Sequence, residues 1–187
     1  MRAFLAVDVE GEETVARLRD LLSELRAIRG LRTVPLHQLH FTLKFFEDLP
    51  TDRVAAAKSA AARAAAASSP FSLSLSGLGT FPPQRPPRVL WVGCEGGSES
   101  LVRLAVSVEK EFTFEGFLPE PRPFSPHLTL ARVKEPRSAR DAAVFASAHS
   151  SFDGESFEVK ELVLYQSVLG PSGAAHTPLG RFPLGAR

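Results

Sequence analysis

The sequence is poor in four residue types, with one cysteine, one methionine, one tryptophan and one tyrosine among its 187 residues. Cys94 is the single cysteine, so the chain cannot form an internal disulfide. A zinc site built on cysteine thiolates is not expected for the same reason. One unpaired thiol fits a protein of the reducing cytoplasm.

Long apolar segments are also missing. No stretch approaches the roughly 20 apolar residues that a membrane-spanning helix needs. Asp8 and Glu10 end the apolar run at residues 3–7. The run is too short for the apolar region of a signal peptide, and acidic residues follow it directly. We therefore expect a soluble cytoplasmic protein without membrane contact.

Neither sign of charge is in excess. The formal net charge is +1 and the isoelectric point lies near 8.0. A protein that coats long duplex nucleic acid through many phosphate contacts would be far more basic. Any anion-binding site must therefore be local. The length and the 44% of hydrophobic residues suit one globular domain or two small lobes with a buried core.

Apolar periodicity and turn residues predict strands alternating with helices. The expected strands are residues 2–9, 39–46, 71–76, 88–93, 127–133, 157–168 and 181–184, and the expected helices are residues 12–29, 52–67, about 99–112 and 139–149. This order predicts an α+β protein with mostly antiparallel sheets. We expect residues 1–187 to form one domain of two similar lobes.

The sequence His-x-Thr-Leu occurs twice, at residues 40–43 and 127–130. Side chains alternate along a strand, so His40 and Thr42 share one face of the first segment, as His127 and Thr129 do in the second. A single copy would carry little information, because histidine and threonine often occur in half-buried strands. Two copies that use two of the five histidines indicate a shared site.

Two imidazoles beside one substrate can move protons in both directions, because histidine has an ordinary pKa of about 6.5. Phosphodiester cleavage needs a base that activates water and an acid that protonates the leaving oxygen. The two threonine hydroxyls can donate hydrogen bonds to the non-bridging phosphate oxygens, where negative charge grows in the transition state. This arrangement requires neither a metal ion nor another cofactor.

Five segments, in order along nearly the whole chain, resemble the two-histidine phosphoesterases. Within them, the sequence is most similar to the bacterial and archaeal RNA 2′,3′-cyclic phosphodiesterases, long described as 2′-5′ RNA ligases. The segments are residues 2–7 (RAFLAV), 39–45 (LHFTLKF), 87–93 (PRVLWVG), 125–132 (SPHLTLAR) and 164–170 (LYQSVLG). The resemblance implies two pseudo-symmetric lobes of mostly antiparallel sheet, with flanking helices, around a central cleft. It also implies hydrolysis of the 2′,3′-cyclic phosphate of RNA ends or nucleotides to a 2′-phosphate, by a monomer that needs no metal.

The same resemblance implies roles for individual residues. His40 would be the proton donor and His127 the proton acceptor, while Thr42, Thr129 and Arg132 would bind the substrate phosphate. Arg132 lies five residues after His127, so strict alternation would point it to the opposite face. A β-bulge, a strand end or its long stem must bring the guanidinium round.

Three other residues have two readings each. Phe4 either stacks on a base of the substrate or packs in the core, and core packing is favoured. Lys44 either adds positive charge on the His40 face or is a solvated lysine at the strand end. Family members often carry a tyrosine after the glycine near the C-terminus, and this chain continues from Gly170 to His176 without one. His176 either lines the cleft or is solvated.

Several alternative functions stay open at this stage. The same acid and base could act in the joining direction, as a 2′-5′ RNA ligase, or on another small phosphodiester. The cleft could instead serve a non-catalytic module that binds RNA ends or nucleotides. A metal hydrolase is a fourth reading, although the motif has no familiar ligand spacing and would need a further carboxylate.

Overall fold

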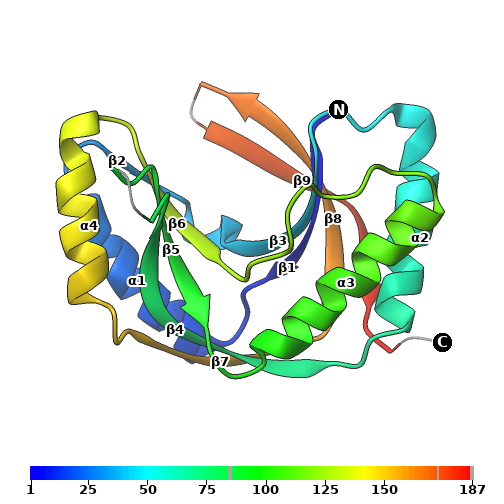
Figure 1. Cartoon of the computed structure of the whole chain (residues 1–187), viewed down its shortest axis with the longest axis horizontal. Coiled ribbons are helices and arrows are strands. Elements are labelled where there is room, and N and C mark those ends of the chain that lie inside the picture. Colours follow the sequence, from blue (N-terminus) through cyan, green and yellow to red (C-terminus); the bar gives the residue numbers. More distant parts are fainter. Residues whose placement is uncertain (84–85, 172, 186–187) are drawn as a thin grey trace.

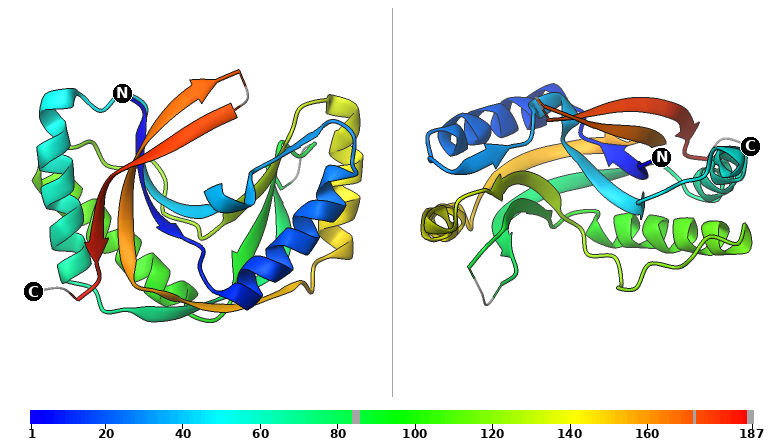
Figure 2. Two further views of the ribbon diagram at one scale, coloured as in Figure 1. Left: turned by 180° about the vertical axis from the view of Figure 1, so that it is seen from behind. Right: turned by 90° about the horizontal axis from the view of Figure 1, so that it is seen from above.

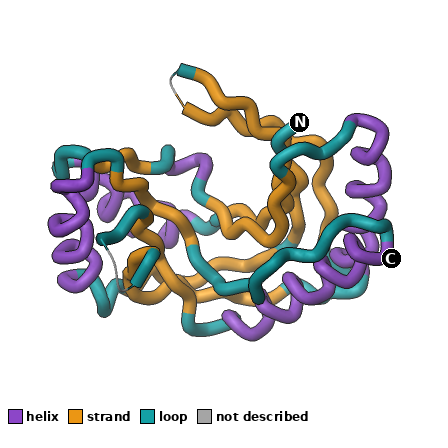
Figure 3. The backbone as a smooth tube through the Cα atoms, turned by 45° about the horizontal axis from the view of Figure 1, so that its top comes forward, coloured by secondary structure: helices purple, strands orange, loops and turns teal. Residues whose placement is uncertain are grey.

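The structure, a computed structural model, describes residues 1–83, 86–171 and 173–185, and within these residues it has two antiparallel sheets and four α-helices. The sheets form the inner layers and the helices the outer layers, so each sheet with its helices makes one lobe (Figure 1). Figure 3 shows the same arrangement, with helices at both sides and strands between them. The predicted α+β class and the two-lobed antiparallel architecture are confirmed.

The first lobe is built on a four-stranded sheet whose two helices cover its outer face. Its strands, in spatial order, are β3 (His40–Phe46), β1 (Ala3–Asp8), β8 (Glu161–Gly170) and β9 (Gly173–Pro183), and its helices are α2 (Val54–Ala66) and α3 (Ser98–Phe114). The hairpin of β8 and β9 extends beyond the other strands (Figure 2).

The second lobe is built on a five-stranded sheet. Its strands, in spatial order, are β2 (Leu31–Thr33), β6 (Leu128–Val133), β5 (Val89–Cys94), β4 (Phe71–Phe81) and β7 (Asp153–Val159), and its helices are α1 (Glu12–Arg26) and α4 (Ala139–Ala148). Short 3₁₀ helices at Leu36–Gln38, Thr51–Arg53 and Pro136–Ser138 complete the described elements.

The two lobes are interleaved in the sequence. Helix α1 follows β1 of the first sheet but packs against β7 and β2 of the second. Helix α3 follows β5 of the second sheet but packs against β3 of the first. Each lobe therefore combines segments from both ends of the chain, and the lobes are not two successive halves.

The alanine-rich segment forms the predicted helix, α2. One side of α2 is fully buried and consists of alanine, at residues Ala57, Ala60, Ala61, Ala64 and Ala65. Alanine has the highest helix propensity, and its small side chain lets two helix backbones approach closely. This explains how α2 packs both on α3 and on the strands β8 and β9.

One predicted strand is wrong. Residues 157–168 form the end of β7 and most of β8, which belong to different sheets and are separated by Lys160. Phe157 and Val159 are buried in the second lobe, whereas Leu162 and Leu164 are buried in the first. The apolar alternation hides the break because it continues on both sides, and no glycine or proline marks it.

Strand β3 contains a β-bulge within its motif. Thr42 lies opposite Ala6 of β1, and Lys44 lies opposite the adjacent residue Leu5. Leu43 is therefore the extra residue of the bulge. An extra residue shifts the side-chain alternation by one position, so the residues after Leu43 exchange faces.

Strand β6 contains a bulge at the same place in the second motif. Thr129 lies opposite Trp91 of β5, and Ala131 lies opposite the adjacent residue Leu90. Leu130, the leucine that follows the threonine, is again the extra residue. Both motif strands thus change register immediately after their threonine.

The first bulge buries Lys44, so both readings of this lysine from the sequence are wrong. Its side chain is 2% exposed and lies on the side of β3 that faces α3. The ammonium donates hydrogen bonds to both carboxylate oxygens of Glu109, at 3.2 and 3.1 Å, and to the carbonyl oxygen of Leu118 at 3.0 Å. Glu120 lies 3.9 Å away. Lys44 therefore joins β3 to α3 and to the segment that leads toward His127.

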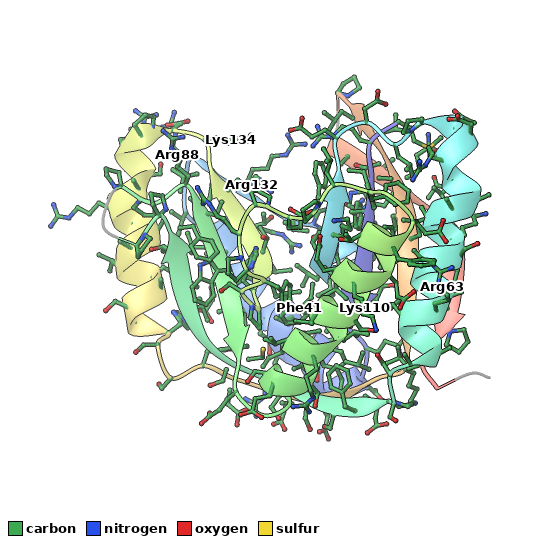
Figure 4. All side chains as sticks on the ribbon, turned by 45° about the vertical axis from the view of Figure 1, so that its right-hand side comes forward. Phe41, Arg63, Arg88, Lys110, Arg132 and Lys134 are labelled. Carbon is green, nitrogen blue, oxygen red and sulfur yellow. The ribbon has the colours of Figure 1, made fainter. Side chains whose placement is uncertain are left out.

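Replacing Lys44 by methionine should lower the free energy of unfolding by about 1–3 kcal/mol, because the Leu118 carbonyl and both carboxylate oxygens of Glu109 lose this donor. Urea unfolding followed by circular dichroism measures this difference. Lys110→Met is the matched control, since this exposed lysine of α3 (Figure 4) should tolerate the change within about 0.5 kcal/mol. Equal losses in both variants would contradict the importance of the buried contact.

Candidate active site

The two motif strands meet at a cleft between the lobes. Strands β3 and β6 belong to different sheets but contact each other. The cleft has a volume of about 820 Å³. All six residues selected from the sequence line it: Phe4, His40, Thr42, His127, Thr129 and Arg132.

The two histidines are held in equivalent ways. Nδ1 of His40 lies 2.7 Å from the carbonyl oxygen of Gln38, and Nδ1 of His127 lies 2.8 Å from that of Ser125. A carbonyl oxygen only accepts hydrogen bonds, so Nδ1 donates in both pairs. This fixes the tautomer of each neutral imidazole and leaves Nε2 to exchange a proton with a ligand.

Phe4 supports His40. The two rings are stacked, with centroids 4.5 Å apart and planes at 15°, and Tyr165 also stacks against Phe4 at 5.2 Å. His176 meets the edge of the Phe4 ring at 4.8 Å. Phe4 is only 3% exposed, although it lines the cleft. This burial favours the packing reading of Phe4, which supports the His40 ring at the cleft.

The environment of His40 alters its proton affinity. Burial lowers the pKa of His40 below its ordinary value, and positive charge on His176 or His127 lowers this pKa further. The hydrogen bond to Gln38 and the carboxylate of Asp8 act in the opposite direction. The effect of His127 on the pKa of His40 shows that the two motif imidazoles lie close enough to interact.

The first lobe adds three residues near His40: His176, for which the sequence left two readings, and Tyr165 and Asp8, to which it assigned no role. His176 lies on β9, lines the cleft, and meets the His40 ring edge-on at 5.7 Å. The Tyr165 hydroxyl donates a hydrogen bond to Asp8 at 2.7 Å, and burial raises the pKa of Tyr165. Strand pairing brings these residues together from β1, β8 and β9, which are far apart in the sequence.

Positive side chains surround the cleft. The bulge at Leu130 returns Arg132 to the cleft face, as its predicted role required. Arg132 is exposed, and Lys134 on the same side of the cleft also lines it, as does Arg2 from the first lobe. Figure 4 shows Arg132 and Lys134 grouped with Arg88 at one end of β5 and β6. A chain of net charge +1 thus gathers cations where an anionic ligand would bind.

Phe45 also faces the cleft, contrary to the simple alternation that placed it with the apolar residues of its strand. The bulge at Leu43 turns Phe45 toward the lumen, and the residue is 38% exposed. Phe45 stands three residues after Thr42, in the position that Arg132 holds after Thr129. The sequence offered no signal for this placement, because a bulge leaves no mark in the residue pattern.

Two features are absent from the described ranges 1–83, 86–171 and 173–185. No three histidine, cysteine, aspartate or glutamate side chains gather there as ligands of a metal ion would. In the same part of the chain, no helix combines the length and apolar character needed to cross a membrane.

Comparison with known proteins gave curated relatives in archaea and bacteria. The sequence is 37% identical over 186 residues to the RNA 2′,3′-cyclic phosphodiesterase of Methanothermobacter thermautotrophicus, covering 98% of this chain and 99% of the relative. It is 34% identical over 190 residues to the protein of the same name from Thermus thermophilus, covering 98% and 90%.

Solved structures agree with these sequence matches. The crystal structure of TT0787 of Thermus thermophilus has a TM-score of 0.82 and 32% identity, and the match covers 99% of this chain and 98% of that one. The structure of E. coli LigT complexed with 3′-AMP has a TM-score of 0.76 and 26% identity, with the same coverage. The family model of the 2′-5′ RNA ligase superfamily matches residues 4–171. The chain, with its paired histidine motifs, therefore belongs to the 2′-5′ RNA ligase superfamily of two-histidine phosphoesterases.

Proposed function

We propose that the protein is an RNA 2′,3′-cyclic phosphodiesterase, which hydrolyses the cyclic phosphate of RNA ends or nucleotides to a 2′-phosphate. The observation that carries this proposal is the meeting of two His-x-Thr strands, one from each sheet, at one cation-rimmed cleft. The names of the curated relatives support the same activity and substrate.

In this reaction His127 accepts a proton from water, and the water oxygen forms a bond to phosphorus. The bond between phosphorus and the 3′ oxygen breaks, and His40 donates the proton that this oxygen takes up. The 2′-phosphate remains. Thr42 and Thr129 donate hydrogen bonds to the non-bridging oxygens, and Arg132 offsets their charge in the transition state. The histidines exchange roles in the reverse reaction.

The surroundings of the two imidazoles support this division of roles. His127 precedes its strand and has the more open position, which suits a base that must reach a water molecule. Burial lowers the pKa of His40, and an imidazolium of lower pKa is a stronger acid for the leaving oxygen. The backbone carbonyls of Gln38 and Ser125 keep both rings oriented.

We also propose that residues 1–187 act as one two-lobed unit and as a monomer. Each lobe supplies one motif strand, so a single chain contains both halves of the site. A cytoplasmic location suits an enzyme that acts on RNA ends. Light scattering of the purified protein checks the oligomeric state, and a stable dimer would contradict the monomer.

The first functional prediction concerns the two motif histidines. His40→Ala and His127→Ala should each reduce turnover of 2′,3′-cyclic AMP by about 100-fold or more, because each removes a proton-transfer group. Much of the affinity for a nucleotide phosphate should remain, since the threonines and Arg132 are intact. Steady-state kinetics and calorimetry measure the two effects.

His37→Ala is the matched control, because His37 is exposed and lies outside the cleft lining. Its kinetics should equal those of the unaltered protein. If binding and turnover fell together in the motif variants while the fold stayed intact, a non-catalytic binding module would be the better description. If cyclic AMP stayed intact while another diester was cleaved, the substrate assignment would be wrong.

The second functional prediction concerns pH. The reaction needs one protonated and one neutral imidazole, so the rate should fall on acidification when both become protonated. Burial lowers the pKa of His40, so His40 becomes protonated at a lower pH than an ordinary histidine. The Asp8 carboxylate raises the pKa of His40, so Asp8→Asn should move the acidic limb of the kcat/KM profile to still lower pH. Tyr165 can still donate to the asparagine carbonyl. A limb that stays in place or moves to higher pH would show that Asp8 does not act on the catalytic imidazole.

The third functional prediction concerns metal. Because paired histidines supply acid and base and Arg132 supplies charge, treatment with a chelator should leave kcat/KM unchanged. The activity of chelator-treated protein is compared with that of protein supplied with Mg²⁺, Mn²⁺ or Zn²⁺. Loss of activity that one of these metals restores would favour a metal hydrolase.

A further inference from the structure

His176 completes a cluster of rings around His40, and the proposed reaction does not use it. The rings of His40, Phe4 and Tyr165 form a stack with Phe4 in the middle. His176 lies beside all three rings, and its centroid is 4.8 Å from that of Phe4, 5.7 Å from that of His40 and 6.1 Å from that of Tyr165. The ring of His176 therefore limits the sideways movement of the His40 ring.

The position of His176 is tied to that of His40 through Gln38. The backbone carbonyl of Gln38 accepts the hydrogen bond from Nδ1 of His40 at 2.7 Å. The side-chain amide of the same residue donates a hydrogen bond to the carbonyl oxygen of Ala174 at 3.0 Å. Ala174 precedes His176 by two residues on β9. Gln38 thus orients the ring of His40 and also anchors the strand that carries His176.

Titratable groups from four other elements face His176. They are Asp8 of β1, His37 of the 3₁₀ helix Leu36–Gln38, His40 of β3 and Tyr165 of β8. The guanidinium of Arg32 on β2 lies close to Gly173, at the start of the strand that carries His176.

The charge of His176 acts on His40. Burial lowers the pKa of His176 below its ordinary value, while the Asp8 carboxylate raises this pKa and charge on His37 lowers it. Positive charge on His176 in turn lowers the pKa of His40. Like charges repel, so a proton on one of these two imidazoles opposes a proton on the other.

We propose that His176 is a positioning residue for the proton donor His40: its ring holds the His40 ring in place, and its protonated form opposes a proton on His40. This inference rests on the proposed function, in which His40 protonates the leaving oxygen. An imidazolium whose proton is opposed by a neighbouring charge gives up that proton more readily, which suits a general acid. His176 thus contributes to the reaction through another side chain and not by touching the reacting atoms.

Two replacements test the contribution of the ring. His176→Phe keeps a ring against Phe4 and His40, so it should keep most of the kcat/KM for 2′,3′-cyclic AMP. His176→Ala removes the ring and should lower kcat/KM about tenfold or more, because a misplaced catalytic group can cost a factor of about 100. An unchanged rate in the alanine variant, or equal losses in both variants, would overturn this part of the proposal.

A third replacement, His176→Gln, tests the contribution of the charge. It removes the positive charge and keeps a polar side chain. The acidic limb of the kcat/KM profile should move to higher pH, because His40 takes up its proton more easily without a positive neighbour. Asp8→Asn should move the same limb in the opposite direction. A side chain that only filled space would leave the limb in place, and this result would overturn the proposal.

A measurement without substrate separates this inference from the proposed reaction. The protonation of His40 is followed by NMR in the free protein, through the carbon-bound protons of its imidazole. The pKa of His40 should be higher in His176→Gln than in the unaltered protein. If this rise is observed but no cyclic nucleotide is hydrolysed, the proposed function alone fails. An unchanged pKa of His40 would overturn the inference.

His149→Gln is the matched control. His149 also stacks on a phenylalanine, Phe145, with centroids 4.1 Å apart, and it lies at the end of α4, outside the cleft lining. It therefore reproduces a phenylalanine–histidine pair away from the site. The acidic limb and the pKa of His40 should both stay in place in this variant. A shift equal to that of His176→Gln would count against a local effect.

Discussion

The arrangement of the site depends on the register of two strand pairs. In each motif the leucine after the threonine is an extra residue, so the strand keeps its alternation from histidine to threonine and then reverses it. Without the reversal, Arg132 would point away from the cleft and the Lys44 ammonium would enter it. One inserted residue in each strand thus decides which charges face the ligand and which are buried.

This explains which site residues the sequence could predict. Both histidines and both threonines precede the bulges, so simple alternation placed them correctly on shared faces. Lys44 and Phe45 follow a bulge, and alternation placed both on the wrong face. Arg132 can face the cleft only if its strand departs from simple alternation, and the bulge at Leu130 is that departure. The burial of Phe4 beneath His40 and Tyr165 favours its packing reading, and contact of Phe4 with a base stays a prediction.

Most helices and strands follow from local patterns, because periodic burial leaves a periodic sequence. Their partners do not follow, because no local signal tells a strand which sheet it joins. The single strand expected at residues 157–168 fails for this reason, since its two parts belong to different lobes. Tyr165 and Asp8 also escaped prediction, and the sequence left two readings for His176, because only strand pairing brings these residues beside His40.

The exchange of helices between lobes has a mechanical consequence. Helix α1 ties the second sheet to β1, and α3 ties the first sheet to β5, so the backbone passes repeatedly from one lobe to the other. Moving the lobes apart would displace several of these connections together. The spacing of the two imidazoles is thereby set by the fold before a substrate arrives. Less reorganisation then separates the bound state from the transition state.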